Sequence, residues 1–327
     1  MKKWLVLEVF VFVALLAVVL VVGLMLPGGE AKPALSGAVS LATTTQATTT
    51  TPETTEPEPT WMTFPEDRQI TAQQAFVYDC QTGSFLYLSG SETDKVYPAS
   101  ITKLFTAYVA MQFLQPTDTI TAGDVLDLVG PGSSVAEISK GDTLTVEQLV
   151  EAMLLPSGND ASYMLAAEAG WIIAGDRSIS PSRAVQKFVD EMNGQARAKG
   201  MTGTHFTNPD GYHDYNHYTN HKDMVTIGKL AMANPTIMKY AVVPTEEVVL
   251  GGETKQWKNT NQLINPDSQF YCAYATGLKT GQTPSAGSCL LSAFDVKGQK
   301  YLIGVFGCPE IEDRFADTLQ LLNENLP

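Results

Sequence analysis

A serine and a lysine stand three residues apart in an otherwise apolar segment, P-A-S-I-T-K-L-F-T-A-Y-V-A-M-Q-F-L, which covers residues 98–114. On a helix, positions i and i+3 lie on the same face, so the Lys103 amine can approach the Ser100 hydroxyl. Lys103 is the only charged residue of the segment, and burial would lower its pKa and favour a neutral amine that accepts a proton. The pair therefore predicts a nucleophilic serine with its own base.

The surrounding residues leave two interpretations of this pair open. Pro98 and Ser100 indicate a helix start, where backbone N–H groups and the helix dipole favour a developing negative charge on the serine. The alternative is that Ser100 only caps a core helix and Lys103 extends its amine outward to solvent. Taken alone, the S-x-x-K motif does not decide between catalysis and structure.

Two further motifs change the balance toward catalysis. An S-G-N motif at 157–159 falls in a predicted break between two helices, and a K-T-G motif at 279–281 falls on a predicted strand. Gly281 would let another group approach that strand's backbone closely. The order S-x-x-K, S-x-N, K-T-G, each in a suitable setting of helix start, interhelical loop and strand, favours a nucleophilic role for Ser100.

The residues around these motifs resemble those of a known protein family. The segments are YPASITKLFTA, LLPSGNDAS, HFTNPDGYHD, NHYTNHKDM and TGLKTGQTPSAGSCL. Together they resemble penicillin-binding D-alanyl-D-alanine carboxypeptidases of the low-molecular-mass serine type, over most of residues 64–322. The resemblance implies the fold of DD-peptidases and serine β-lactamases, and removal of the terminal D-alanine from peptidoglycan stem pentapeptides. Many relatives carry a second β-rich domain and a C-terminal anchor, and we expect the N-terminal segment to replace that anchor here.

The resemblance and the residue chemistry assign the same roles. Ser100 would attack the penultimate D-alanine carbonyl with Lys103 as base, which forms an acyl-enzyme. Lys279, near Lys103, would help to lower the Lys103 pKa and would bind the substrate's terminal carboxylate. Thr280 and Gly281 would bind the substrate, and the N–H groups of Ser100 and Gln282 would form an oxyanion hole. Ser157 would relay a proton to the leaving amine. Asn159 would bind the substrate amide and Lys103.

Several expectations about ligands and competing functions follow. The resemblance implies β-lactams as acylating inhibitors and needs neither a cofactor nor a metal. The net charge of −14 and the lack of a basic patch argue against a nucleic-acid partner. A serine β-lactamase, a DD-endopeptidase and a catalytically silent peptidoglycan-binding protein remain as alternatives. No convincing E-x-x-x-N motif for fast deacylation is present, and the intact motifs speak against a silent protein.

The elements that must position these residues follow from periodicity. Two strands are expected from Ala75 to Leu88 around Thr82-Gly83, and three more at 276–283, 287–296 and 299–308. Helices are expected between them: one after a Thr145–Gln148 capping box and ended by Pro156, one from 161 stopped by Gly170, one over 182–199 and one from 222 to 233. Residues 205–223 would form a loop. A last amphipathic helix over 311–325 would bury one face, made of Ile311, Phe315, Leu319 and Leu322. This order predicts an α+β domain whose antiparallel sheet comes from both chain ends and is covered by helices.

The cysteines and histidines give weaker signals. A hairpin turn at Gly298-Gln299 would set Cys289 opposite Cys308, although in a pair poorly placed for a disulfide. Four free thiols, at positions 80, 272, 289 and 308, are slightly favoured. Histidines at 213, 217 and 221 would form a metal stripe on a helix, but the Asn-Pro and Asp-Gly pairs favour a loop, and we predict no metal site.

The N-terminal region differs in composition from the rest of the 327-residue chain. Residues 4–26 are apolar or glycine except for Glu8, which predicts a retained membrane anchor within segment 1–26 and, as the alternative, a cleaved signal peptide. Residues 27–60 form a Thr/Pro/Glu-rich linker, and residues 61–327 the catalytic domain. Either interpretation places that domain outside the cytoplasm, at the membrane or secreted.

Overall fold

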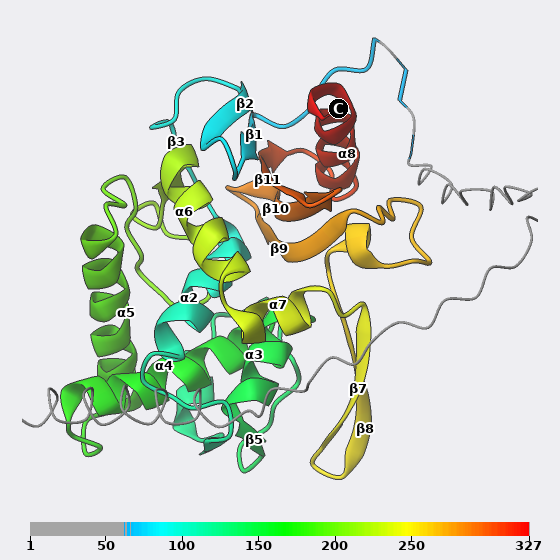
Figure 1. The fold of residues 1–327 in the computed structure, drawn as a ribbon. Coiled ribbons are helices and arrows are strands. Elements are labelled where there is room, and N and C mark those ends of the chain that lie inside the picture. The colour runs from blue at the N-terminus through cyan, green and yellow to red at the C-terminus, as the bar shows by residue number, and fades with distance from the viewer. Residues whose placement is uncertain (1–61, 63, 66, 327) are drawn as a thin grey trace, which may run out of the picture. The chain divides into compact units, whose positions relative to one another are not determined.

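The computed structural model describes residues 62, 64–65 and 67–326 (Figure 1). The anchor and linker predicted for residues 1–60 lie outside the described residues. Within the described part, no helix has the length and apolarity that a membrane crossing requires.

A five-stranded antiparallel sheet brings the two ends of the described chain together. Its spatial order is β2-β1-β11-β10-β9. The N-terminal strands are β1 (Gln74–Asp79) and β2 (Ser84–Leu88), and the C-terminal strands are β9 (Ala275–Thr283), β10 (Gly287–Val296) and β11 (Gln299–Cys308). Because β1 pairs with β11 along its whole length, the predicted assembly of one sheet from both ends is confirmed, as is the α+β class.

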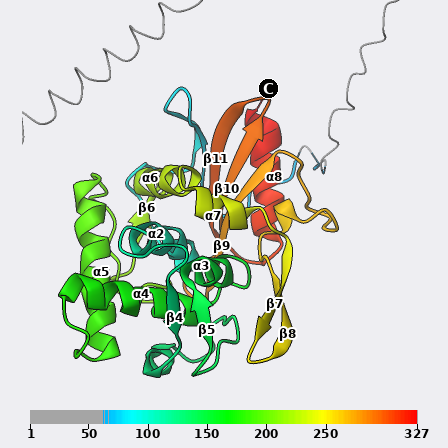
Figure 2. The ribbon, with the colours of Figure 1, turned by 60° about the horizontal axis from the view of Figure 1, so that its bottom comes forward.

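Helices cover both faces of this sheet (Figures 1 and 2). On one face, α8 (Asp313–Asn325) packs on the sheet through Phe315, Leu319 and Leu322. The other face supports a larger helical part, whose elements are α2 (Thr102–Ala110), α3 (Val146–Leu154), α4 (Asn159–Ala174), α5 (Pro181–Ala198), α6 (His221–Met232) and α7 (Pro235–Ala241). A buried core therefore lies on each side of the sheet.

Short elements complete the described part. Three two-stranded sheets pair β3 (Lys95–Val96) with β6 (Thr219–Asn220), β4 (Thr119–Thr121) with β5 (Thr143–Thr145), and β7 (Thr245–Leu250) with β8 (Glu253–Lys258). Three 3-10 turns are η1 (Ala99–Ile101), η2 (Asp124–Leu128) and η3 (Gln262–Ile264). The β7–β8 hairpin and α7 were not expected from the sequence.

The helix boundaries show which local sequence signals predicted a helix end correctly. The Thr145–Gln148 capping box is present at the start of α3. Gly170, in contrast, does not stop α4, which continues to Ala174 and ends at the left-handed Gly175. Helix packing requires glycine at position 170, because a Cβ there would lie 1.9 Å from the carbonyl oxygen of Ala184 in α5. The glycine thus allows two helices to approach closely.

The turn of the β10–β11 hairpin lies one residue earlier than predicted. Its turn is Lys297-Gly298, with Val296 opposite Gln299, because Lys297 and Gly298 both adopt positive φ as a tight hairpin turn requires. An irregularity between Ser288 and Leu290 then sets Cys308 opposite Ser288 and not Cys289. The expected position of Cys289 opposite Cys308 is therefore wrong, and the favoured expectation of four free thiols is confirmed.

Two smaller expectations also need correction. The segment predicted as a loop over 205–223 contains strand β6 and the first residues of α6, together with an isolated bridge between His205 and Tyr218. Ile311 precedes α8 and is exposed, so it does not belong to the buried face of that helix. In both cases tertiary contacts decided what the local pattern left open.

Candidate active site

Ser100 and Lys103 lie at the junction of a 3-10 turn and a helix. Ser100 is in η1 and Lys103 is in the first turn of α2, so the serine stands one turn before the lysine. Lys103 Nζ donates to Ser100 Oγ at 2.7 Å. Ala99, directly before the serine, has φ +48°, a left-handed conformation that costs a non-glycine residue about 1 kcal/mol or more. The surrounding structure holds the serine in a turn that its sequence alone disfavours.

Lys103 is fully buried and has three acceptors around its amine. Nζ donates to Ser100 Oγ, to Asn159 Oδ1 at 2.8 Å and to the Asp210 carbonyl oxygen at 2.9 Å. Burial lowers the pKa of Lys103 to about 8, against the opposing charges of Asp210 and Asp160. Three acceptors match an ammonium ion, and loss of one proton would leave the lone pair to face Ser100. The amine can therefore exchange a proton with the serine near neutral pH.

The S-G-N segment lies at the start of α4. Ser157 is buried with φ +64°, and Asn159 is the first residue of the helix. A Cβ on Gly158 would lie 2.6 Å from Asp160 Oδ1 and 2.9 Å from the Ala152 carbonyl oxygen. The tight turn therefore needs glycine at its centre, and it directs Asn159 toward Lys103.

Strand β9 brings the K-T-G segment against the turn that holds the serine. A Cβ on Gly281 would lie 2.6 Å from the Pro98 carbonyl oxygen and 3.2 Å from the Ser100 backbone nitrogen. The prediction that Gly281 permits a close backbone approach is thus confirmed. Gln282, the next residue, lines the same cleft as Ser100.

Lys279 is a second fully buried amine. Nζ donates to Thr260 Oγ1 and to the Thr280 carbonyl oxygen, both at 3.3 Å, and Thr260 and Thr280 share a hydrogen bond of 2.6 Å between their hydroxyls. Burial, and then repulsion from Lys103 and Arg314, hold the pKa of Lys279 well below its usual range. Burial is the main cause of the lowered Lys103 pKa, and our expectation that Lys279 contributes to it stays a prediction.

A cleft of about 530 Å³ opens over these groups. Ser100, Asn159 and Gln282 line it, and the Lys103 and Lys279 side chains are fully buried. The other lining residues come from three segments: 131–134, 211–213 and 283–285. A nucleophile that opens on a cleft above two buried amines suits acyl transfer to and from a bound peptide.

Some residues of the site were not singled out from the sequence. Asp160 binds the residues that follow cleft segment 131–134, because its carboxylate accepts from the Ala136 and Ile138 N–H groups at 3.0 and 3.1 Å. Arg314 of α8 is buried and donates to the Gly281 carbonyl oxygen at 3.4 Å. Asp210 lies within the segment that we predicted only as a loop, and nothing in its local pattern indicates contact with Lys103.

The histidines take structural positions. Thr207 N–H donates to Nδ1 of His217 at 3.2 Å, so Nε2 carries the proton and donates to Thr102 Oγ1 at 2.8 Å. His221 is buried against the rings of Phe76 and Phe306, which also contact each other. No group of three metal-ligating side chains occurs among the described residues.

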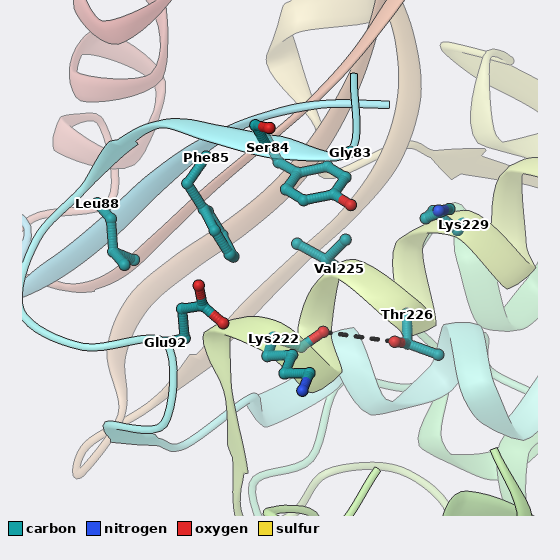
Figure 3. A pocket seen from close by; sticks show the side chains of 10 residues that line it. Gly83, Ser84, Phe85, Leu88, Glu92, Lys222, Val225, Thr226 and Lys229 are labelled. Atoms are coloured by element: carbon teal, nitrogen blue, oxygen red, sulfur yellow. Dashed lines mark hydrogen bonds between the residues drawn. The ribbon is translucent and has the colours of Figure 1, made fainter. Parts of the chain in front are cut away.

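A second pocket, of about 490 Å³, lies between the β1–β2 hairpin and α6 (Figure 3). Phe85 and Leu88 form part of one wall, and Lys222, Val225 and Thr226 part of the other. None of the residues predicted for catalysis or binding lines this pocket. The chemistry is therefore concentrated in the cleft at Ser100.

Known proteins share both sequence and architecture with this chain. A D-alanyl-D-alanine carboxypeptidase from Streptomyces sp. (strain K15) is 31% identical over 265 residues, which cover 78% of this chain and 87% of that protein. The D-alanyl-D-alanine carboxypeptidase DacF from Bacillus subtilis (strain 168) is 28% identical over 258 residues, covering 77% of this chain and 61% of the relative. The chain thus matches less than two thirds of the length of DacF.

Solved structures give the same result. The crystal structure of the Streptomyces K15 DD-transpeptidase superposes with a TM-score of 0.71 at 28% identity, over 79% of this chain and 98% of that one. Penicillin-binding protein D2 from Listeria monocytogenes, in its ampicillin-bound form, gives a TM-score of 0.63 at 25% identity, over 78% and 98%. Residues 60–308 match the D-alanyl-D-alanine carboxypeptidase family, and the chain belongs to that family.

Proposed function

We propose that this chain is a serine D-alanyl-D-alanine carboxypeptidase that works through an acyl-enzyme on Ser100. The observation that carries the proposal is the 2.7 Å contact between Lys103 Nζ and Ser100 Oγ, made by a lysine that is fully buried and has a pKa of about 8. A substantial fraction of this amine can be neutral at mildly alkaline pH, and a neutral amine can take the serine proton.

The acylation step would use the three motifs together. Lys103 accepts the Ser100 proton as Oγ attacks the carbonyl carbon of the penultimate D-alanine. The C–N bond then breaks, and the leaving amine of the terminal D-alanine takes up a proton through Ser157. Asn159, bound to Lys103, would also hold the substrate amide. Water then attacks the ester, restores the Ser100 hydroxyl and releases the shortened peptide.

Binding of the substrate would rest mainly on strand β9. The terminal carboxylate would approach Lys279 and Thr280, and this negative charge would raise the lowered pKa of Lys279 and return it to the ammonium form. The N–H groups of Ser100 and Gln282 would stabilise the oxyanion, in which a single donor is typically worth about 3 kcal/mol. Gly281 supports this arrangement, because it lets β9 lie against the Ser100 turn.

β-Lactams would act as inhibitors by acylating the same serine. Ampicillin bound to the similar Listeria protein supports this part of the proposal. A serine β-lactamase would instead release the drug quickly, and a DD-endopeptidase would cut crosslinked peptides at the same site. Peptidoglycan stem peptides that end in D-Ala-D-Ala are the substrates we propose.

The test is covalent labelling of residues 61–327 with a fluorescent penicillin, together with release of D-alanine from a stem pentapeptide. We expect both reactions in the wild type and neither in Ser100→Ala, whereas Ser133→Ala, which changes another serine of the cleft, keeps the label. Label that persists for many minutes excludes an efficient β-lactamase. Release of D-alanine at the normal rate by Ser100→Ala would contradict the proposal, and a crosslinked dimeric peptide as substrate separates endopeptidase from carboxypeptidase activity.

We also propose that residues 4–26 anchor the enzyme with its catalytic part on the extracytoplasmic side. The apolar run and the two preceding lysines support this orientation. The test is fractionation of cells that express the full chain with a C-terminal tag. A membrane-bound, full-length product accessible to external protease supports the anchor, whereas a shortened product in the medium indicates a cleaved signal.

A further inference from the structure

Thr260 lies between the β7–β8 hairpin and η3, outside the three motifs of the site. Its main chain is held by contacts that do not involve its own side chain. Thr260 N–H donates to the Leu155 carbonyl oxygen at 3.2 Å. Next to it, Asn259 Nδ2 donates to the Val243 carbonyl oxygen at 3.1 Å, and Asn261 N–H donates to Asn259 Oδ1 at 2.9 Å. The position of Thr260 is therefore fixed independently of its hydroxyl group.

The hydroxyl group of Thr260 contacts two residues of the K-T-G motif. Its Oγ1 lies 2.6 Å from Thr280 Oγ1 and accepts from Lys279 Nζ at 3.3 Å. Thr280 Oγ1 is 3.5 Å from the same amine, so Thr260 is the nearer of the two hydroxyls. Through its N–H group, Thr260 also holds Leu155, two residues before Ser157. One residue outside the motifs thus joins the S-G-N side of the site to the K-T-G strand.

Lys279 and Thr280 are almost completely buried, with exposed fractions of 1% and 3%. Among the described residues, Lys279 Nζ has two hydroxyl oxygens and one main-chain carbonyl oxygen as acceptors, at 3.3 to 3.5 Å. These distances exceed the roughly 2.9 Å of a typical N–H···O hydrogen bond. None of these acceptors carries a charge, and a buried ammonium group is costly without an anionic partner. A bound carboxylate would supply the counter-ion that the amine lacks.

The direction of the hydrogen bond between the two threonines decides whether Thr280 can bind such a carboxylate. A hydroxyl group has one hydrogen to donate. If Thr280 donates to Thr260, only the lone pairs of Thr280 face the anion and repel it. If Thr260 donates to Thr280, the Thr280 hydrogen is free to bind the anion. Thr260 then accepts from Lys279, and the three groups form one head-to-tail chain, in which hydrogen bonds polarise and strengthen each other.

We propose that Thr260 is a positioning residue that acts through Thr280: it accepts from Lys279, donates to Thr280, and so orients the Thr280 hydroxyl toward the terminal carboxylate of the substrate. The inference rests on the proposed function, in which that carboxylate approaches Lys279 and Thr280. It deepens that function, because the chain favours a free carboxylate over a neutral carboxamide. Hydrogen bonds to an ionised acceptor are about twice as strong as those to a neutral one.

The first experiment measures kcat and KM of the full chain for a stem pentapeptide that ends in D-Ala-D-Ala. Thr260→Val removes the hydroxyl and keeps the branched shape of the side chain. We expect kcat/KM to fall roughly five- to twentyfold, since a hydrogen bond beside a charged group is lost. The loss should appear mainly as a higher KM, because the carboxylate is bound in both the ground state and the transition state. Thr260→Ser, which restores a hydroxyl, should return kcat/KM to within about threefold of the wild type.

Thr121→Val is the matched control. It also removes a hydroxyl from a pair of threonines, since Thr121 Oγ1 lies 2.8 Å from Thr143 Oγ1 between β4 and β5, but neither residue lines the cleft at Ser100. Its kcat and KM should equal those of the wild type. If Thr260→Val does not fold, Thr260→Ala removes the same hydroxyl. Unchanged kinetics in a folded variant without the hydroxyl, or no recovery in Thr260→Ser, would overturn the inference.

A binding measurement separates this inference from the proposed function. In a Ser100→Ala background, which cannot be acylated, NMR titration gives Kd for the pentapeptide and for the same peptide with a terminal carboxamide. Thr260→Val should weaken binding of the free acid roughly fivefold or more and leave binding of the carboxamide nearly unchanged. An equal loss for both peptides would show a merely structural role and overturn the inference. A folded wild type that neither releases D-alanine nor takes up penicillin would overturn the proposed function instead.

Discussion

The Lys103 amine lies 2.7 Å from the Ser100 hydroxyl oxygen, although the lysine side chain has no contact with solvent. One partner of this amine comes from the same helix start, and the other two come from Asn159 and Asp210, which lie far away in sequence. The spacing of Ser100 and Lys103 is therefore set by one short segment, whereas the pKa of Lys103 depends on distant segments. Four predictions follow from these contacts.

Lys103→Met should remove the base while preserving the fold. Methionine has a similar unbranched shape and no charge to desolvate, so the core around α2 can accept it. We expect penicillin labelling to slow by roughly 10²- to 10⁴-fold, the usual contribution of a general base. Lys140→Met, at an exposed lysine paired with Asp124 and Asp127, serves as the control and should label normally. Normal labelling of a folded Lys103→Met protein would contradict a role as base.

Gly281→Ala should impair acylation through backbone displacement. The new Cβ would lie 2.6 Å from the Pro98 carbonyl oxygen, so β9 and the Ser100 turn must separate. We expect acylation to fall by at least about tenfold, because small misplacements of reacting groups are costly. Gly194→Ala in α5, where a Cβ meets no atom within 4 Å, should keep activity and stabilise the helix by about 1 kcal/mol. Equal activity of the two variants would show that the approach of β9 is not needed.

Asp160→Ala should remove the side-chain contacts that hold the residues after cleft segment 131–134. Its buried carboxylate accepts from the N–H groups of Ala136, Ile138 and Ala161, which would lose their partner. We expect the free energy of unfolding in urea to fall by about 3 kcal/mol. Asp142→Ala, which removes a single exposed contact to Ser139 N–H, should cost less than about 1 kcal/mol. A similar loss in both variants would argue against Asp160 as the anchor of this segment.

Acid should destabilise the fold through His217. Burial lowers the pKa of His217 to about 3, whereas an unfolded histidine titrates near 6.5. The unfolded chain therefore binds a proton first, and the stability contributed by the neutral ring is full above pH 6.5 and is lost as the pH falls toward 3. At pH 4 the loss from this one group is about 3 kcal/mol.

Thermal unfolding at pH 4 and pH 7 measures this effect. His217→Gln should be less stable at pH 7, because the contact with Thr102 changes, but should show a smaller drop between the two pH values. His205→Gln, at an exposed histidine of the same loop, should keep the wild-type drop. An identical pH dependence in wild type and His217→Gln would rule out His217 as the main cause.

The sequence alone was enough for the parts that depend on short segments. The spacing of Ser100 and Lys103 puts both on one helical face, and the order of the three motifs indicates the chemistry. Strand periodicity at both ends of the chain predicted the sheet, and Thr145 with Gln148 predicted the start of α3. These signals need only neighbours within one turn or one strand, because local sterics and side-chain alternation determine them.

Only the tertiary structure decided the contacts between distant segments. The packing of α4 on α5 explains why Gly170 does not end a helix, and the Lys297-Gly298 turn decided that Cys289 does not face Cys308. The acidity of Lys103 depends on complete burial and on Asp210, which no spacing within the sequence connects to it. Burial and the charges around a group are properties of the assembled core, and for that reason a local pattern can name the reactive pair but cannot set its pKa.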